Sequence, residues 1–172
     1  MYLSGLFCFS QLGFYVILLL SMKTATNQIG IITCAKATVD MDCCASPCLR
    51  DLRENGGVFG KNYTNPPILV GILSCAGCAS KNNFINKIRS IAEFGVDAIH
   101  FSFCMLAMCP FLDEHISAVT REFPNLKIVK GTHATNIDTQ LWLKYVDTAK
   151  KHGLKMNDVI SRRIVTKLDK TT

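Results

Sequence analysis

The chain has 172 residues, which is enough for one domain with a well-buried core and too short for two ordinary domains. Hydrophobic residues make up 49% of the chain and charged residues 19%, a balance that excludes general disorder. The formal net charge of +6 does not indicate a nucleic-acid partner, because ionising six of the nine cysteines would offset about six positive charges. The basic C-terminal tail also lacks the interleaved aromatic residues of a single-strand binding surface. We therefore expect no nucleic acid partner.

The first 22 residues contain no charged side chain, and their length approaches the roughly 20 apolar residues that span a bilayer. A secretory signal is disfavoured, because such a signal needs a positively charged first region and no Lys or Arg precedes Lys23. The segment is then either a membrane anchor or a non-native extension, with translation starting at Met22. We favour the extension, which predicts a cytoplasmic protein; the anchor would leave the domain facing the cytoplasm.

From residue 28 the chain alternates short apolar runs with longer stretches of helical period, which is typical of β-α units on a parallel sheet. The first predicted strand is 28–33, followed by a cysteine-rich loop and a helix over 47–55 that Gly56-Gly57 terminates. The second predicted strand is 68–74. Because it is apolar on both faces, we expect it to be a central strand.

The second half of the chain repeats this alternation. Its apolar periodicity predicts a helix over 82–94, a strand over 96–103, a helix over 111–123, a strand over 126–131 and a last helix over 139–152. The expected fold is α/β and three-layered, Rossmann-like or flavodoxin-like, with a mostly parallel sheet of about four strands and helices on both faces. His100 and Trp142 are expected in the core, and His115 and His152 in solvent.

A metal-ligating residue follows each predicted strand. Cys34, Cys75 and Cys104 come directly after the first three strands, and His133 follows the fourth. The carboxyl ends of parallel strands lie on one edge of the sheet, where ligands bind, so the topology brings these four residues to one edge. Thiolate and imidazole are good ligands for soft or borderline metal ions.

The loops at the same edge supply four more thiols, from Cys43, Cys48, Cys78 and Cys109. The two-residue gap between Cys75 and Cys78 lets both sulfurs turn toward one ion, and the following helix N-terminus favours the thiolate. Seven cysteines and one histidine are enough for two tetrahedral sites, or for one site with spare redox thiols. Two cysteines are left out of this set. Cys8 lies in the apolar first segment and is expected to be a buried hydrophobic residue, and Cys44 adjoins Cys43, so one of the two is expected to point away from the site.

Over residues 29–133 the chain resembles the CGGC domain family, small proteins regarded as zinc-binding. The resemblance implies a domain over 28–153 that binds a metal, between the apolar segment 1–22 and a basic tail at 154–172. Two departures are Ala76, where the family usually has glycine, and Phe111, where a histidine is expected. The resemblance rests on the following residues: Cys34, Cys43 to Cys48, Val70-Gly71, Cys75, Cys78, Gly95-Val96-Asp97, Ile99-His100, Cys104, Cys109-Pro110 and Gly131-Thr132-His133.

Four functional readings remain open. The first is an intracellular domain that holds zinc through thiolates and His133. The second is a thiol-disulfide redox enzyme in which Cys75 attacks and Cys78 resolves. An iron-sulfur cluster could replace zinc, because thiolates serve both. The last reading is an exported structural protein with disulfides. The sequence does not decide whether the chain is an enzyme.

Overall fold

Four parallel strands form the sheet at the centre of the molecule. The computed structural model describes residues 27–78, 81–133 and 139–155, and its strands are β1 (Gln28–Thr33), β2 (Ile68–Ser74), β3 (Ala98–Phe101) and β4 (Lys127–Lys130). Their order across the sheet is β2-β1-β3-β4, and every neighbouring pair is parallel. The predicted α/β fold is confirmed.

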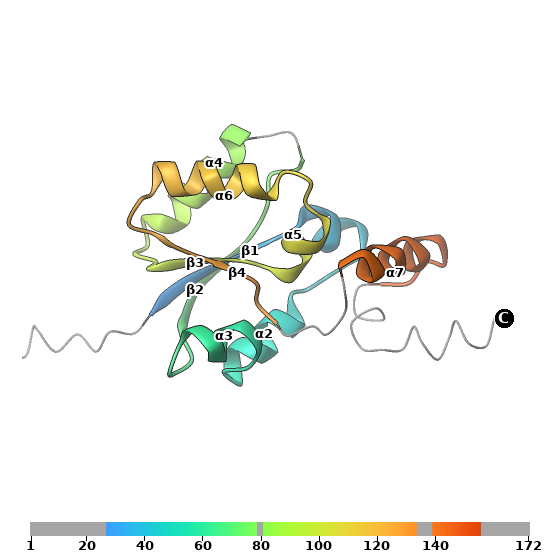
Figure 1. Ribbon diagram of the computed structural model, residues 1–172, viewed down its shortest axis with the longest axis horizontal. Coiled ribbons are helices and arrows are strands. Elements are labelled where there is room, and N and C mark those ends of the chain that lie inside the picture. The colour runs from blue at the N-terminus through green and yellow to red at the C-terminus, as the bar shows by residue number, and fades with distance from the viewer. Residues whose placement is uncertain (1–26, 79–80, 134–138, 156–172) are drawn as a thin grey trace, which may run out of the picture.

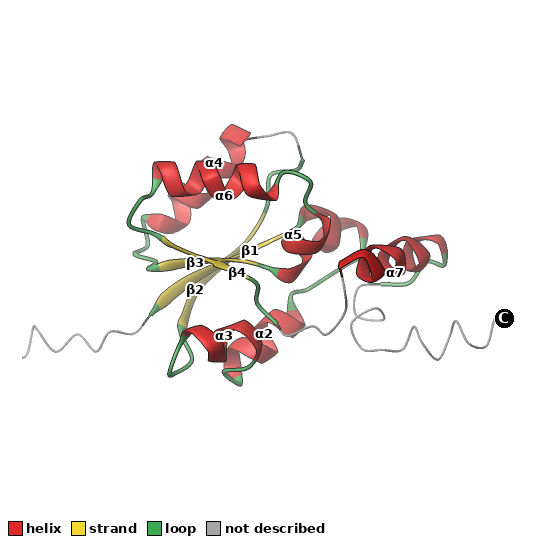
Figure 2. Ribbon diagram, viewed as in Figure 1, coloured by secondary structure: helices red, strands yellow, loops and turns green. Residues whose placement is uncertain are grey.

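The helices form a layer on each face of the sheet, with α4 and α6 on one side and α2 and α3 on the other (Figure 1). Figure 2 shows α7 beside α5, at one end of the sheet. The helical elements are the π-helix η1 (Lys36–Asp40), α2 (Ser46–Arg53), α3 (Gly57–Asn62), α4 (Lys81–Ala92), α5 (Phe103–Met108), α6 (Leu112–Glu122) and α7 (Thr139–Lys151).

Each face of the sheet has its own hydrophobic core. Phe84, Ile88 and Ile91 of α4 and Val119 of α6 pack on one face, as the apolar stripes of these helices predict. On the other face, a cluster from α2, α3 and the sheet contains Leu52, Phe59, Tyr63, Ile29, Ile31, Ala98 and Val129. Burial on both sides holds the strands in register and so fixes where their carboxyl ends lie.

β2 lies at the edge of the sheet, so the prediction that it is central is wrong. Ile68 and Ile72 are 51% and 37% exposed, whereas Ile29, Ile31 and Ile32 of β1 are fully buried. The chain goes from β1 outward to β2 and then crosses to the other side of β1 to form β3. The connections after β1 and after β3 therefore leave on opposite faces of the sheet, which makes the carboxyl ends of these two strands the topological switch point.

Two short α-helices, α3 and α5, were not predicted, and η1 lies where a loop was expected. β3 ends at Phe101 and α5 begins at Phe103, so Cys104 lies in a helix and not directly after a strand. The six residues of α5 (FCMLAM) are apolar throughout, and periodicity cannot separate such a run from a buried strand. Gly56-Gly57 ends α2 as predicted, but α3 begins at once from Gly57.

His115 is buried, with 3% of its surface exposed, and its ring stacks on Phe84 at a centroid distance of 4.1 Å, so its predicted place in solvent is wrong. It shares the inner face of α6 with Ile116 and Val119. His152 is exposed and His100 is buried, as predicted. The side chain of Trp142 lies outside the described residues, as do the segment 1–22 and the tail from residue 156.

In the described parts of the chain, no helix combines the length and the apolar character needed to cross a membrane.

Replacing Gly30 of β1 by alanine is expected to lower the free energy of unfolding by about 1–3 kcal/mol. A Cβ at this position would lie 2.7 Å from Ile91 Cδ1 and 2.8 Å from Ile99 Cδ1, so the core on the α4 face must shift. Gly71→Ala on β2 is the matched control, because its Cβ would approach Ile91 Cδ1 only to 3.3 Å. Urea unfolding should give a clearly smaller loss for Gly71→Ala; equal losses would contradict the packing argument.

Candidate metal and thiol site

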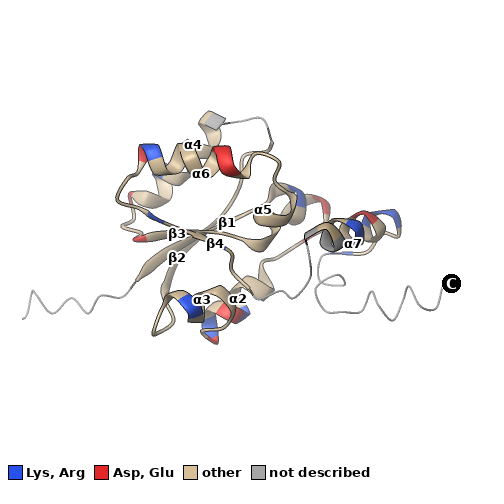
Figure 3. Cartoon of the chain, in the orientation of Figure 1, with Lys and Arg blue, Asp and Glu red and all other residues tan. Residues whose placement is uncertain are grey.

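The chemistry-bearing side chains form a row along the carboxyl edge of the sheet. Cys75 follows β2, Cys34 follows β1, Cys104 lies just past β3 in α5, and His133 follows β4. Their order along the edge is therefore the strand order. Charged side chains lie on α2, α3 and α7, whereas α5, which carries Cys104, has none (Figure 3).

The row has two parts. The first part lies at the switch point and contains Cys34, Cys75 and Cys104, with Cys34 in the middle. Its backbone N–H donates a hydrogen bond to Cys104 Sγ at 3.2 Å, and its thiol donates to the sulfur of Cys75. The next amide, that of Ala35, donates to Cys75 Sγ at 3.2 Å. Three sulfurs from three strand ends are thus held around one turn of backbone.

These contacts give the thiols of this part different acidities. The hydrogen bond from the Cys34 thiol lowers the pKa of Cys75 to about 5, with help from the amides of Ala35 and Gly77 and the nearby His115 and against the effect of burial. The same hydrogen bond and burial raise the pKa of Cys34. These shifts favour the thiolate form at Cys75 and the protonated form at Cys34.

Cys104 is almost fully buried, and burial raises its pKa although the Cys34 amide and the Ser102 hydroxyl, 3.0 Å from its sulfur, act in the opposite direction. Cys109 is half-buried and burial raises its pKa also, with smaller contributions from the charges of Cys75 and Cys78. Cys109 therefore lies near the β2 end of the row. Cys78 is exposed.

The second part of the row lies at the β4 end. Cys48 of α2 lies 3.2 Å from Thr132 Oγ1 and 3.5 Å from His133 Nδ1, and the His133 ring meets Phe103 edge-on at 5.3 Å. Burial raises the pKa of Cys48 to about 12 and lowers that of His133. The charges of Cys104 and Cys43 both raise the pKa of Cys48, and the charge of Cys43 also raises the pKa of Cys104, so the two parts of the row act on each other electrostatically.

Four residues were not predicted to take part in the site: Ser102, Asp51, His115 and Thr132, although Thr132 belongs to the Gly131-Thr132-His133 motif. Ser102 and Thr132 are fully buried and hold Cys104 and Cys48 respectively. Asp51 is a buried carboxylate that pairs with Arg50 and acts electrostatically on His133. Two of these residues had a signal in the sequence. Asp51 comes three residues after Cys48 on a helix, so both lie on one face, and His115 lies on the apolar stripe of α6.

The donor types fit a soft or borderline metal ion, since thiolates and an imidazole line the edge. In the described residues no three or more His, Cys, Asp or Glu side chains are grouped closely enough to hold an ion. The sulfurs of Cys34, Cys75 and Cys104 are therefore joined by separate contacts near residues 34 and 35 and do not surround a common point. No disulfide joins the described cysteines, and the exposed Cys44 sulfur lies 2.9 Å from Ser46 Oγ.

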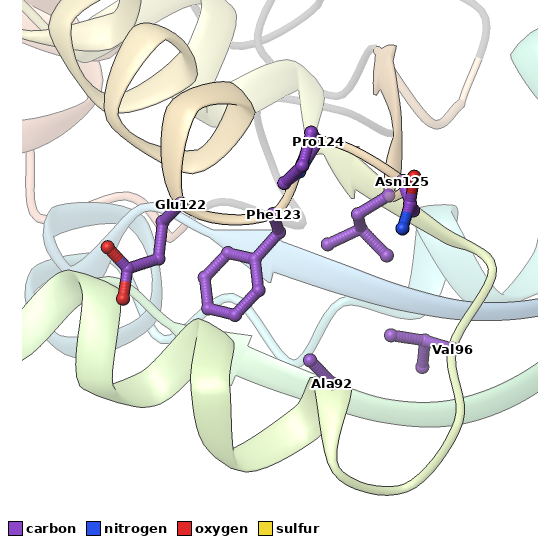
Figure 4. A pocket seen from close by; sticks show the side chains of 7 residues that line it. Ala92, Val96, Glu122, Phe123, Pro124 and Asn125 are labelled. Atoms are coloured by element: carbon purple, nitrogen blue, oxygen red, sulfur yellow. The ribbon is translucent and has the colours of Figure 1, made fainter.

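A shallow cavity of about 310 Å³ lies at the opposite edge of the sheet, where α4 and α6 end and β3 and β4 begin (Figure 4). Its lining contains no cysteine or histidine; the residues are Ala92, Val96, Glu122, Phe123, Pro124, Asn125 and Leu126. The thiol row and this cavity are therefore separate features.

The parallel sheet and the thiol row at its carboxyl edge describe an α/β domain rich in cysteine. The family model of the CGGC domain matches residues 28–133, more than half of the chain, and the chain belongs to this family. The predicted resemblance is confirmed. The family is rich in cysteine and is associated with metal binding. Searches of curated proteins and of solved structures found no significant match.

Proposed function

We propose that the chain binds a transition-metal ion, zinc, through the thiol row. The observation that carries the proposal is the arrangement around Cys34, whose thiol and amide contact the sulfurs of Cys75 and Cys104. Zinc takes up to four thiolate or imidazole ligands in tetrahedral geometry, and a bound ion would offset the negative charge of neighbouring thiolates. The family association with metal binding supports the same conclusion.

One ion cannot use the whole row. Parallel strands lie about 4.8 Å apart, so the four strand ends span roughly 14 Å, whereas a zinc-sulfur bond is about 2.3 Å long. The first centre would consist of Cys34, Cys75 and Cys104, completed by Cys109 or Cys43, with Cys78 in reach of the β2 end. A second would use Cys48 and His133 with Cys43. Forming either centre requires rotation of side chains, because no three of the described ligands already surround a common point.

Thr132 and Ser102 would orient the ligands of these centres, since ligating side chains are held by hydrogen bonds from neighbours. The ion would supply a cross-link between strand ends and would keep the thiols reduced and deprotonated. Such a role fits a reducing compartment, so we place the domain in the cytoplasm.

Metal analysis of the full chain, purified without oxygen, tests the proposal. We expect stoichiometric zinc, and we expect Cys34→Ala and Cys104→Ala to lose the ion of the centre at the switch point, because each removes a thiolate from that centre. Cys44→Ala is the matched control and should keep the full content. Reduced, folded protein without stoichiometric metal would refute the proposal, and a brown protein with inorganic sulfide would replace zinc by an iron-sulfur cluster.

A second candidate is thiol-disulfide chemistry with Cys75 as the attacking group and Cys78 as the resolving one. The low pKa of Cys75, set by the Cys34 thiol and two amides, favours it. A Cys75→Ser protein that keeps its metal but loses all disulfide reductase activity would support this candidate over the first.

A further inference from the structure

Cys34 and Cys75 occupy the next rung of the ladder between β1 and β2. The last paired residues are Thr33 and Ser74, and the Cys75 N–H continues the ladder by donating to the Thr33 carbonyl at 2.9 Å. Neighbouring parallel strands are about 4.8 Å apart, which lies within the range of Cα separations, about 4.4–6.8 Å, that a disulfide bridges. The backbone therefore holds these two cysteines at a distance that permits a bond between their sulfurs.

The Cys75 sulfur lies beside the chain at Cys34. The amide of Ala35, the residue after Cys34, donates to Cys75 Sγ at 3.2 Å. The opposite effects of the two thiols on each other's pKa agree with this placement. Cys78, the other cysteine of the Cys75-Ala76-Gly77-Cys78 motif, is exposed on the loop beyond Gly77, whose φ of +95° turns the chain. Cys34 is therefore the cysteine that the strand ladder places beside Cys75.

Burial gives the two sulfurs different roles. Cys34 is only 4% exposed, whereas Cys75 is half-buried and can be reached from solvent. A disulfide arriving from outside meets Cys75 first, and Cys34 lies directly behind it. This is the arrangement of an attacking thiol and a resolving thiol.

We propose that Cys34 and Cys75 are a dithiol pair that reduces small-molecule disulfides, with Cys75 attacking and Cys34 resolving. The Cys75 thiolate attacks one sulfur of the disulfide, forming a mixed disulfide and releasing one thiolate. The Cys34 thiol loses its proton and attacks the Cys75 sulfur, which releases the second thiolate and leaves a Cys34–Cys75 disulfide. The substrate disulfide gains two electrons and becomes two thiolates, one of which takes up the proton that Cys34 gives up; the protein loses two electrons and this one proton.

This activity does not require a bound metal, and formation of the disulfide competes with metal binding. The Cys34–Cys75 disulfide removes two of the thiolates proposed as zinc ligands, and a disulfide sulfur is a poor ligand compared with a thiolate. Oxidation by a disulfide would therefore release the ion, and the ion would slow oxidation.

The test uses the reduced full chain, stripped of metal and exposed to oxidised glutathione, followed by peptide mapping with mass spectrometry. We expect a Cys34–Cys75 cross-link. Cys34→Ala should stop at the first step and retain glutathione on Cys75, whereas Cys78→Ala should form the cross-link as the unchanged protein does. Circular dichroism of each variant checks folding, and Cys34→Ser provides a second variant if Cys34→Ala does not fold.

Recovery of Cys34 and Cys75 as thiols, or a cross-link from Cys75 to Cys78 or Cys109, would overturn the proposal. Zinc analysis of the same preparations keeps this result separate from the metal hypothesis, since the metal-free protein can fail to form the disulfide while the reduced protein still binds zinc. If both proposals hold, we expect the zinc-loaded protein to lose zinc when oxidised glutathione is added. The Cys78→Ala variant should keep its zinc until the Cys34–Cys75 cross-link forms.

Discussion

Lowering the pH from 7 to 4 is expected to reduce the free energy of unfolding by about 3 kcal/mol through His100 alone. This histidine is fully buried, and burial lowers its pKa to about 4, with a smaller effect of Lys127 in the same direction. The unfolded chain binds the proton with a pKa of about 6.5. Because the folded-state value is the lower one, the stabilisation is present above pH 6.5 and is lost as the pH falls toward 4.

The neutral form of His100 satisfies both of its hydrogen bonds. Gly131 O lies 2.9 Å from Nδ1 and can only accept, so Nδ1 carries the proton. Nε2 then accepts from the Tyr63 hydroxyl at 2.8 Å. Protonation of Nε2 would turn the Tyr63 hydroxyl from donor to acceptor, so the cost of protonation comes from the charge placed inside the core on the α3 face of the sheet.

Urea unfolding of metal-free, reduced protein at several pH values measures the effect. His100→Gln should be less stable than the unchanged protein at pH 7, because Tyr63 and Gly131 lose a well-placed partner, but it should lose less stability between pH 6.5 and 4. His152→Gln is the matched control, since His152 is exposed at the end of α7, and it should keep the original pH dependence. An unchanged slope in His100→Gln would contradict the assignment.

The sequence predicted the strands well and their order only in part. The strands at Gln28–Thr33 and Ile68–Ser74 were predicted with the bounds they have, because strong turn signals such as Pro66-Pro67 flank short apolar runs. The place of β2 in the sheet was not predictable from its own composition, because the crossing from β2 over β1 to β3 is a property of the whole chain. An apolar edge strand looks the same in sequence as a central one.

For the site, topology predicted the edge but not the spacing along it. Cys34, Cys75, Cys104 and His133 were expected together because all follow parallel strands, and they do lie on one edge. The rule about carboxyl ends says nothing of distances between strands, so it could not show that the donors form a row with two parts. Which thiol contacts Cys75 was also hidden, because Cys34 is its neighbour through the ladder and not through the motif.

Zinc is expected to raise the free energy of unfolding of the reduced chain by about 4 kcal/mol when free zinc exceeds its dissociation constant a thousandfold. The proposed centre at Cys34, Cys75 and Cys104 joins the ends of β2 and β1 to α5, so the ion binds only where these elements are folded together. Unfolding frees the thiols from one another and the ion loses its multidentate site. Any affinity of the unfolded cysteines for zinc would make the gain smaller.

Thermal and urea unfolding with zinc, and again after addition of a chelator, measure this gain. Cys34→Ala and Cys104→Ala should be stabilised much less by zinc, whereas Cys44→Ala should respond as the unchanged protein does, because the exposed Cys44 sulfur lies beside Ser46 and outside the row. If zinc binds stoichiometrically but does not change the midpoint of unfolding, the ion is bound by thiols that unfolding does not separate. Cys75 and Cys78, with only two residues between them, would then be the pair that holds it, and the centre at the switch point would be wrong.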